Sequence, residues 1–302
     1  MPFGSRRIAL VLDTALKLPR SGHLRAVLNR SLLLRSIPKS GTNYLRLLIT
    51  NYTCNLAPGP EKRAGAFTRI SYREMHHRIF PNMRSDIYER KSAYREPEIH
   101  RAPALAEHYA DFLYDHGCIL DRFRAYLPKK LLLSYRNPLD TIISMFFYTW
   151  KNRQGREDLY DHPREVIDPL LANFVPAYRL IRSIHRREGE ERSLLIAYER
   201  IFLHPHEALG EVLAFLGLEV DRELVSRSVE AASIKETRKE EAHLGGAIHA
   251  PKEGLKGSFA RSGKVGQWRE FFDEADLDRI RTRLRKGGID LEEFCLDPKT
   301  TS

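Results

Sequence analysis

The stretch Ser31-Leu-Leu-Leu-Arg-Ser-Ile-Pro-Lys-Ser-Gly-Thr-Asn-Tyr-Leu-Arg-Leu-Leu-Ile-Thr50 decides the fold of this chain. Its apolar residues 32–37 predict a buried strand that ends at Pro38. The polar turn 39–43 follows, and the leucines after it predict a helix. A strand that leads through such a turn into a helix presents unpaired N–H groups and partial positive charge. The segment therefore predicts an α/β fold with a binding site for a phosphate or sulfate group.

A second junction between a strand and a helix lies in the middle of the chain. Residues 130–135 predict another buried strand, and Pro138 suits the first turn of a helix. Arg136 follows the strand, and Ser144 comes eight residues later. A guanidinium can bind two phosphate oxygens at once, and a nearby hydroxyl can donate to a third. The alternative role for Arg136 is a surface salt bridge with Asp140.

The two junctions together resemble the cofactor-binding motifs of sulfotransferases that use PAPS (3'-phosphoadenosine 5'-phosphosulfate). Residues 38–42 match the family's Pro-Lys-Ser-Gly-Thr, and residues 136–140 match its Arg-Asn-Pro-x-Asp. A third segment, 259–268, is similar to the family's Arg-Lys-Gly-x-x-Gly-x-Trp, with Ser262 in place of the Lys. The resemblance runs from about residue 32 to residue 268. It implies a parallel β-sheet flanked by helices, in the P-loop NTPase-like sulfotransferase fold.

The resemblance also implies a role for each matching residue. Lys39 would contact the bridging oxygen of the leaving product PAP (adenosine 3',5'-bisphosphate), and His116 would take the acceptor proton as general base. Tyr44 and Tyr198 would contact the adenine. The implied cofactor-binding residues are Lys39, Ser40, Gly41, Thr42, Asn43, Tyr44, Arg136, Ser144, Tyr198, Ser233, Arg261, Ser262 and Gly263. The open alternatives are His100, His108, Glu107 and Asp115 for the base, and Lys264 for the cation that Ser262 lacks.

Composition restricts the partners and the location of the protein. The net charge of +10, from 50 basic and 40 acidic residues, predicts an anionic ligand such as PAPS or an acidic acceptor. No nucleic-acid-binding motif is present, so we expect no nucleic-acid partner. The three cysteines are widely spaced, which predicts neither a disulfide framework nor a zinc site and favours the reducing cytoplasm. Apolar runs are too short for a transmembrane segment. Residues 10–28 predict an N-terminal helix packed against the protein, with peripheral membrane contact as the alternative.

The chain shows no repeat and no Pro/Gly/Ser-rich linker, so its 302 residues predict a single domain, 1–302. We expect the motif-bearing core at about 31–272, an N-terminal helical extension at 1–30 and a C-terminal helical tail at 273–302. Residues 57–103 predict an irregular insertion, and 239–256 a mobile lid. The family's dimerisation motif is not matched near residues 269–278, which leaves the oligomeric state open.

These observations predict a PAPS-dependent sulfotransferase that acts, without a metal, on a hydroxyl of a carbohydrate, a glycolipid or another small molecule. The Arg- and His-rich loops favour a polar or sugar acceptor. The first alternative is a nucleotide-binding P-loop kinase. It is disfavoured because the turn has no earlier glycine, and its lysine precedes Gly41 instead of following it. The second alternative is a non-catalytic basic module that binds anionic polymers.

Overall fold

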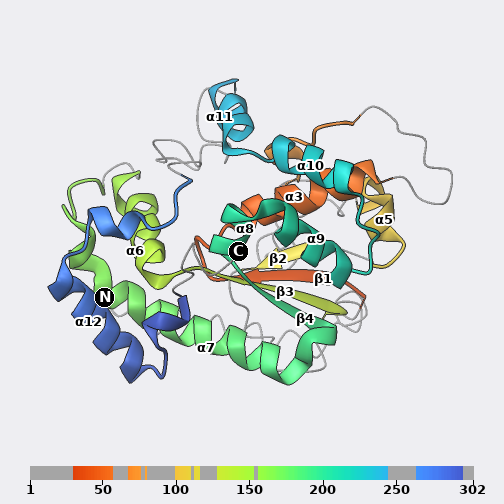
Figure 1. Ribbon diagram of the computed structural model, residues 1–302. Helices are drawn as coiled ribbons and strands as arrows, with labels where there is room; N and C mark the ends of the chain where they lie inside the picture. Colours follow the sequence, from red (N-terminus) through yellow and green to blue (C-terminus); the bar gives the residue numbers. More distant parts are fainter. Residues whose placement is uncertain are drawn as a thin grey trace, which may run out of the picture.

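A four-stranded parallel sheet forms the centre of the computed structural model (Figure 1). The strands are β1 (Leu32–Ser36), β2 (Phe112–Asp115), β3 (Lys130–Tyr135) and β4 (Ser193–Ala197), in the order β2-β1-β3-β4. The structure describes residues 30–56, 67–75, 79, 99–109, 112–115, 128–152, 156–243 and 263–294. Strand β1 lies in the middle and pairs with β2 and β3. The fold is therefore the single α/β domain with a helix-flanked parallel sheet that the sequence predicts.

Helices cover the two faces of the sheet because successive side chains of a strand point to opposite faces. Leu32 and Leu34 of β1 belong to the hydrophobic cluster on one face, whereas Leu33 belongs to the cluster on the other. The first face is covered by α3 (Thr42–Asn55), α9 (Pro205–Phe215) and α10 (Arg222–Ala231). The helical segments of the second face are α6 (Pro138–Phe146), η7 (Phe147–Lys151), η8 (Pro163–Val166), α7 (Ile167–Arg192), η9 (Gln267–Glu270), α12 (Glu274–Lys286) and η10 (Leu291–Phe294).

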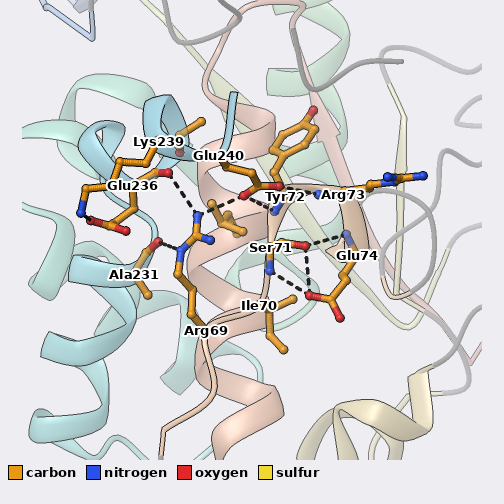
Figure 2. A network of polar contacts seen from close by, with 12 residues as sticks. Arg69, Ile70, Ser71, Tyr72, Arg73, Glu74, Ala231, Glu236, Lys239 and Glu240 are labelled. Atoms are coloured by element: carbon orange, nitrogen blue, oxygen red, sulfur yellow. Dashed lines mark hydrogen bonds and ion pairs between the residues drawn. The ribbon is translucent and has the colours of Figure 1, made fainter. Parts of the chain in front are cut away.

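A network of polar contacts joins the segment around residue 70 to α10 and α11 (Ile234–His243) (Figure 2). Arg69 donates to the carbonyl of Ala231 at 3.2 Å and to the Glu240 carboxylate at 3.1 Å. Glu240 also accepts from the backbone N–H groups of Tyr72 and Arg73. The network fixes the short helix α4 (Tyr72–Glu74) against α11. The remaining described helices are η4 (Ile99–Arg101), α5 (Pro103–Ala106) and α8 (Tyr198–Leu203).

The structure corrects the predicted lid and adds a packing role to the predicted C-terminal helical tail. Residues 239–243 of the predicted lid belong to α11, where Glu240 accepts from Arg69, and the rest of that lid lies outside the described residues. The predicted C-terminal tail packs into the core, since Leu277, Ile280 and Leu284 of α12 join the cluster on the second face. The N-terminal extension lies outside the described residues, except residue 30. Within the described part of the chain, no helix has both the length and the apolar character needed to cross a bilayer.

Candidate functional site

The turn between β1 and α3 adopts a backbone conformation that few sequences allow. Lys39 has φ of +71°, and it is the only non-glycine residue with positive φ in the described part of the chain. Gly41 has φ of +73°, and a Cβ built on it would lie 2.3 Å from Cδ2 of Tyr198. A left-handed conformation costs a residue with a side chain roughly 1–2 kcal/mol, and such residues concentrate at functional sites. The turn is therefore a strained structure held in place by its surroundings.

Hydroxyl groups hold this turn from both sides. The Ser36 and Thr42 side chains share a hydrogen bond of 2.5 Å beneath it, and the Ser134 hydroxyl of β3 donates to the Ser40 carbonyl at 2.8 Å. The Ser40 hydroxyl is buried and has no hydrogen-bond partner among the described residues. No acidic residue lies in the first turn of α3. A buried unpaired donor and a free helix N-terminus are features that fit an anionic ligand.

Arg136 lies where the three sequence motifs meet. Its guanidinium donates to the backbone carbonyls of Lys39 at 3.5 Å and Lys264 at 3.1 Å, and it stacks 4.3 Å from the centre of the Tyr198 ring. The residue is 7% exposed, and its Nε–H is buried without a partner in the described part of the chain. The structure thus places the Arg136 guanidinium, which follows β3, beside the turn that follows β1. Its Nε–H is positioned to donate to a ligand.

Asp140 holds the third motif against the second. Its carboxylate accepts from the backbone N–H groups of Gly266 at 2.7 Å and Trp268 at 3.2 Å. The alternative salt bridge between Arg136 and Asp140 is present at 3.6 Å, but both side chains are buried. The pair is therefore part of the junction between motifs and not a surface salt bridge. The anchoring role of Asp140 escaped sequence reasoning, although Arg-Asn-Pro-x-Asp contains it.

Tyr44 of α3 and Tyr198, the first residue of α8, lie close to the turn. Burial raises the pKa of the Tyr44 phenol to about 12, and the neighbouring Tyr198 phenol adds to the shift. The Tyr198 ring stacks on Phe202, with centroids 5.7 Å apart. The next residue, Glu199, is buried and accepts from the backbone N–H of Asn137 at 3.0 Å, and burial raises the pKa of its carboxyl group. These contacts give the turn an aromatic wall close to Arg136.

Gly263 and Ser233 lie at the edge of the same region. A Cβ built on Gly263 would lie 2.4 Å from Cδ1 of Ile234 and 3.6 Å from Phe202, so the third motif passes against the start of α11 and against α8. Ser233 directly precedes Ile234, and its hydroxyl accepts from the backbone N–H of Glu236 at 3.4 Å. The structure therefore brings the neighbourhood of Ser233 to the third motif.

The other predicted residues divide into two groups. Asn43 accepts from Arg46 at 2.7 Å, and the half-buried Ser144 lies on α6, which begins directly after Arg136 and Asn137. His116, Arg261 and Ser262 lie outside the described residues. One contact that sequence reasoning missed is made by Tyr148, whose ring centre lies 4.1 Å from Nζ of Lys39. The sequence offered one signal for this contact: Tyr148 lies four residues after Ser144, about one helical turn further along the same predicted helix.

The alternative bases are not all equally placed. The carbonyl of His108 accepts from Nζ of Lys129, which precedes β3, whereas Arg136 follows β3. A six-residue strand spans about 20 Å. His108 and the adjacent Glu107 therefore lie near the amino-terminal ends of the strands, whereas the turn lies at their carboxyl-terminal ends. His100 is exposed on η4. The geometry disfavours His108 and Glu107 as bases.

A basic groove of about 760 Å³ lies elsewhere, between α7 and the end of α12. Its cationic lining residues are Arg179, Arg182, Arg186, Arg285 and Lys286. Arg182 pairs with Glu293, and the two cations of α12 lie at a helix C-terminus, where positive charge offsets the helix dipole. None of the predicted site residues lines this groove, so the turn after β1 remains the candidate site.

Comparison with known proteins agrees with this geometry. The family model described as "Sulfotransferase domain" matches residues 29–287. A solved structure of retinol dehydratase with retinol and PAP has a TM-score of 0.58 at 16% identity, covering 91% of this chain and 85% of its own. A mouse sulfotransferase in complex with PAP has a TM-score of 0.52 at 17% identity, covering 90% and 92%. No curated protein matches the sequence significantly. At these identities the structural likeness concerns the fold.

Proposed function

The chain belongs to the sulfotransferase domain family, and from that premise we propose that it transfers a sulfuryl group from PAPS to a hydroxyl of an acceptor. One observation carries the proposal. The Arg136 guanidinium contacts both the strained turn, at the carbonyl of Lys39, and the third motif, at the carbonyl of Lys264. Buried hydrogen-bond donors without partners among the described residues lie at this junction. Ser40 and Arg136 supply these donors, and they fit the phosphate and sulfate oxygens of PAPS and PAP.

The chemistry requires a base, a positioned cation and reactants in line. We propose that Lys39 stabilises charge on the bridging oxygen as the bond from sulfur to PAP breaks. The acceptor oxygen forms the new bond to sulfur, and His116 takes its proton. Arg136 and Ser144 would hold the 3'-phosphate, with Arg261, Ser262 and Gly263 beside them. Tyr44, Tyr198 and Ser233 would line the adenine site, and Thr42 and Asn43 would complete the turn.

The acceptor that we propose is a carbohydrate, a glycolipid or another small molecule with a hydroxyl group. Tyr148 lies beside Lys39, so the ring face and hydroxyl of an aromatic side chain lie next to the turn. Such amphipathic side chains suit a sugar. An apolar alcohol is the second candidate, because the retinol dehydratase structures contain retinol or androsterone.

Calorimetry with PAP tests the cofactor assignment. PAP should bind and raise the melting temperature, whereas ATP with Mg²⁺ should do so far less, because the turn lacks the features of a nucleotide triphosphate loop. Arg136→Ala should weaken PAP binding by roughly 2–3 kcal/mol, the cost of losing a charge-assisted hydrogen bond. Arg186→Ala, at the basic groove between α7 and α12, is the matched control and should leave PAP affinity unchanged. Equal stabilisation by ATP and PAP would favour the kinase alternative.

An acceptor screen with radiolabelled PAPS then tests the chemistry. His116→Ala should keep PAP affinity but lower turnover by about 10²–10⁴, the range for a lost general base. Lys39→Ala should lower both turnover and cofactor affinity. Binding of PAP and anionic polymers without turnover on any sugar, lipid or small alcohol would favour the non-catalytic module. Wild-type turnover in His116→Ala would reassign the base to His100 or Asp115.

A further inference from the structure

The candidate catalytic lysine contacts an aromatic ring that no motif includes. Nζ of Lys39 lies 4.1 Å from the centre of the Tyr148 ring, in the geometry of a cation–π interaction. Lys39 itself is half-buried and has its backbone in the left-handed conformation. The direction in which this side chain leaves the turn is thus set by a strained backbone, and the ring lies under its charged end.

Neighbouring aromatic contacts fix the segment that carries Tyr148. Tyr148 belongs to η7, a π-helical turn that continues α6, and such turns are frequent at functional sites. Phe146 is 1% exposed, Phe147 packs edge-on against Phe271, and Trp150 packs edge-on against Tyr160. These anchors hold the turn on both sides of Tyr148. The ring facing Lys39 is therefore held by the core of the second face.

The same continuous helical segment carries the residues proposed for the 3'-phosphate. Arg136 lies two residues before it, Ser144 lies on α6, and Tyr148 lies four residues further on. A ligand that engages Arg136 and Ser144 would thus bind to the element that also holds Lys39. Phosphate binding and lysine position are linked by one rigid element and not by a loop.

A flexible lysine needs such a support. Its ammonium is a point charge on a four-carbon stem, and fixing that stem costs about 2 kcal/mol of rotamer entropy. A ring face below the ammonium offsets part of this cost before the substrate arrives. Preorganisation of this kind acts on turnover more than on substrate affinity.

We propose that Tyr148 is a positioning residue for Lys39, and that the ring face holds the lysine ammonium in place for sulfuryl transfer. The hydroxyl of Tyr148 is not required for this role. The inference rests on the proposed function for its effect on turnover, but the contact itself does not depend on any activity.

Two substitutions separate the ring from the hydroxyl. Tyr148→Phe keeps the ring face, whereas Tyr148→Leu removes it. Tyr148→Leu should lower kcat about 5- to 30-fold, the change that corresponds to a cation–π contact of about 1–2 kcal/mol, with KM for the acceptor little changed. Tyr148→Phe should keep turnover near wild type. Phe147→Leu is the matched control, because its ring contacts Phe146 and Phe271 instead of Lys39.

A double-mutant cycle tests whether Tyr148 acts through Lys39. In a Lys39→Met background, Tyr148→Leu should cause no further loss of turnover. The proposal is overturned if Tyr148→Phe is as damaging as Tyr148→Leu, because the hydroxyl would then be the active group. It is also overturned if Tyr148→Leu and Lys39→Met act additively, or if Phe147→Leu reproduces the same loss of kcat.

A spectroscopic measurement tests the contact without any activity. Lysines reductively methylated with ¹³C-formaldehyde keep their charge, and the Lys39 signal is identified by its loss in Lys39→Arg. Because it lies over a ring face, this signal should be shifted upfield, remain so in Tyr148→Phe and return to the position of an exposed lysine in Tyr148→Leu. An unshifted wild-type signal overturns the inference. A shifted signal in a protein that transfers no sulfuryl group would support the contact and refute the proposed function.

Discussion

Gly41→Ala is the substitution whose cost the structure defines most closely. Alanine at φ of +73° loses roughly 1–2 kcal/mol, of which about 0.4–1 kcal/mol is offset because alanine also restricts the unfolded chain. The new Cβ would lie 2.3 Å from Tyr198, so the ring or the turn must move, and overpacking of this kind costs about 1–3 kcal/mol. The expected loss in the free energy of unfolding is therefore about 1–5 kcal/mol.

The matched control for this substitution is Gly217→Ala. Gly217 has φ of +76°, and nothing lies within 4 Å of a Cβ built on it, so the variant isolates the backbone term of about 1 kcal/mol. Urea denaturation of both variants at equal m-value measures the two losses, and calorimetry should show weakened PAP binding only for Gly41→Ala. Equal losses of stability in the two variants would refute the steric argument about Tyr198.

Three further predictions concern carboxylates that accept backbone hydrogen bonds. Asp140→Asn should lower the free energy of unfolding by about 1–3 kcal/mol in urea, because the backbone N–H of Gly266 loses a charged acceptor. Burial raises the pKa of the Glu199 carboxyl group above its ordinary value of 4.5. Proton binding to Glu199 therefore stabilises the folded state fully below that pH. This stabilisation is lost as the pH rises through the pKa of the folded state. Glu199→Gln should therefore gain stability relative to wild type between acidic and neutral pH, and a constant difference in melting temperature would contradict the burial argument. Glu240→Ala should speed hydrogen exchange of the backbone amides in the Tyr72–Glu74 helix, because it removes the carboxylate that accepts from Arg69 and from the backbone N–H of Tyr72. Unchanged exchange would show that the network does not hold this segment.

The sequence predicted the parts of the fold that depend on local pattern. Runs of leucine flanked by turn residues marked β1 and β3 because strands buried on both faces are apolar throughout. The turn after β1 was recognisable because Gly41 and its neighbours specify its backbone conformation locally.

Features that depend on distant contacts could not be predicted in the same way. The lid prediction failed for residues 239–243 because Glu240 is held by Arg69, about 170 positions away in sequence. The contacts of Asp140 with Gly266 and of Tyr148 with Lys39 likewise form only when segments far apart in the sequence meet. The positions of His116, Arg261 and Ser262 remain predictions, since they lie outside the described residues.

The arrangement of the second face has a consequence for synthesis on the ribosome. Its cluster begins with residues of β1 and α6 but includes Ile280 and Leu284 of α12 and Phe294 beyond it. At 5–20 residues per second, the roughly 150 residues between α6 and Phe294 take about 7–30 s to translate. During that interval, the apolar side of α6 and α7 lacks its cover and is a natural binding surface for chaperones. Vectorial folding would therefore complete the layer of α3 and α9 first.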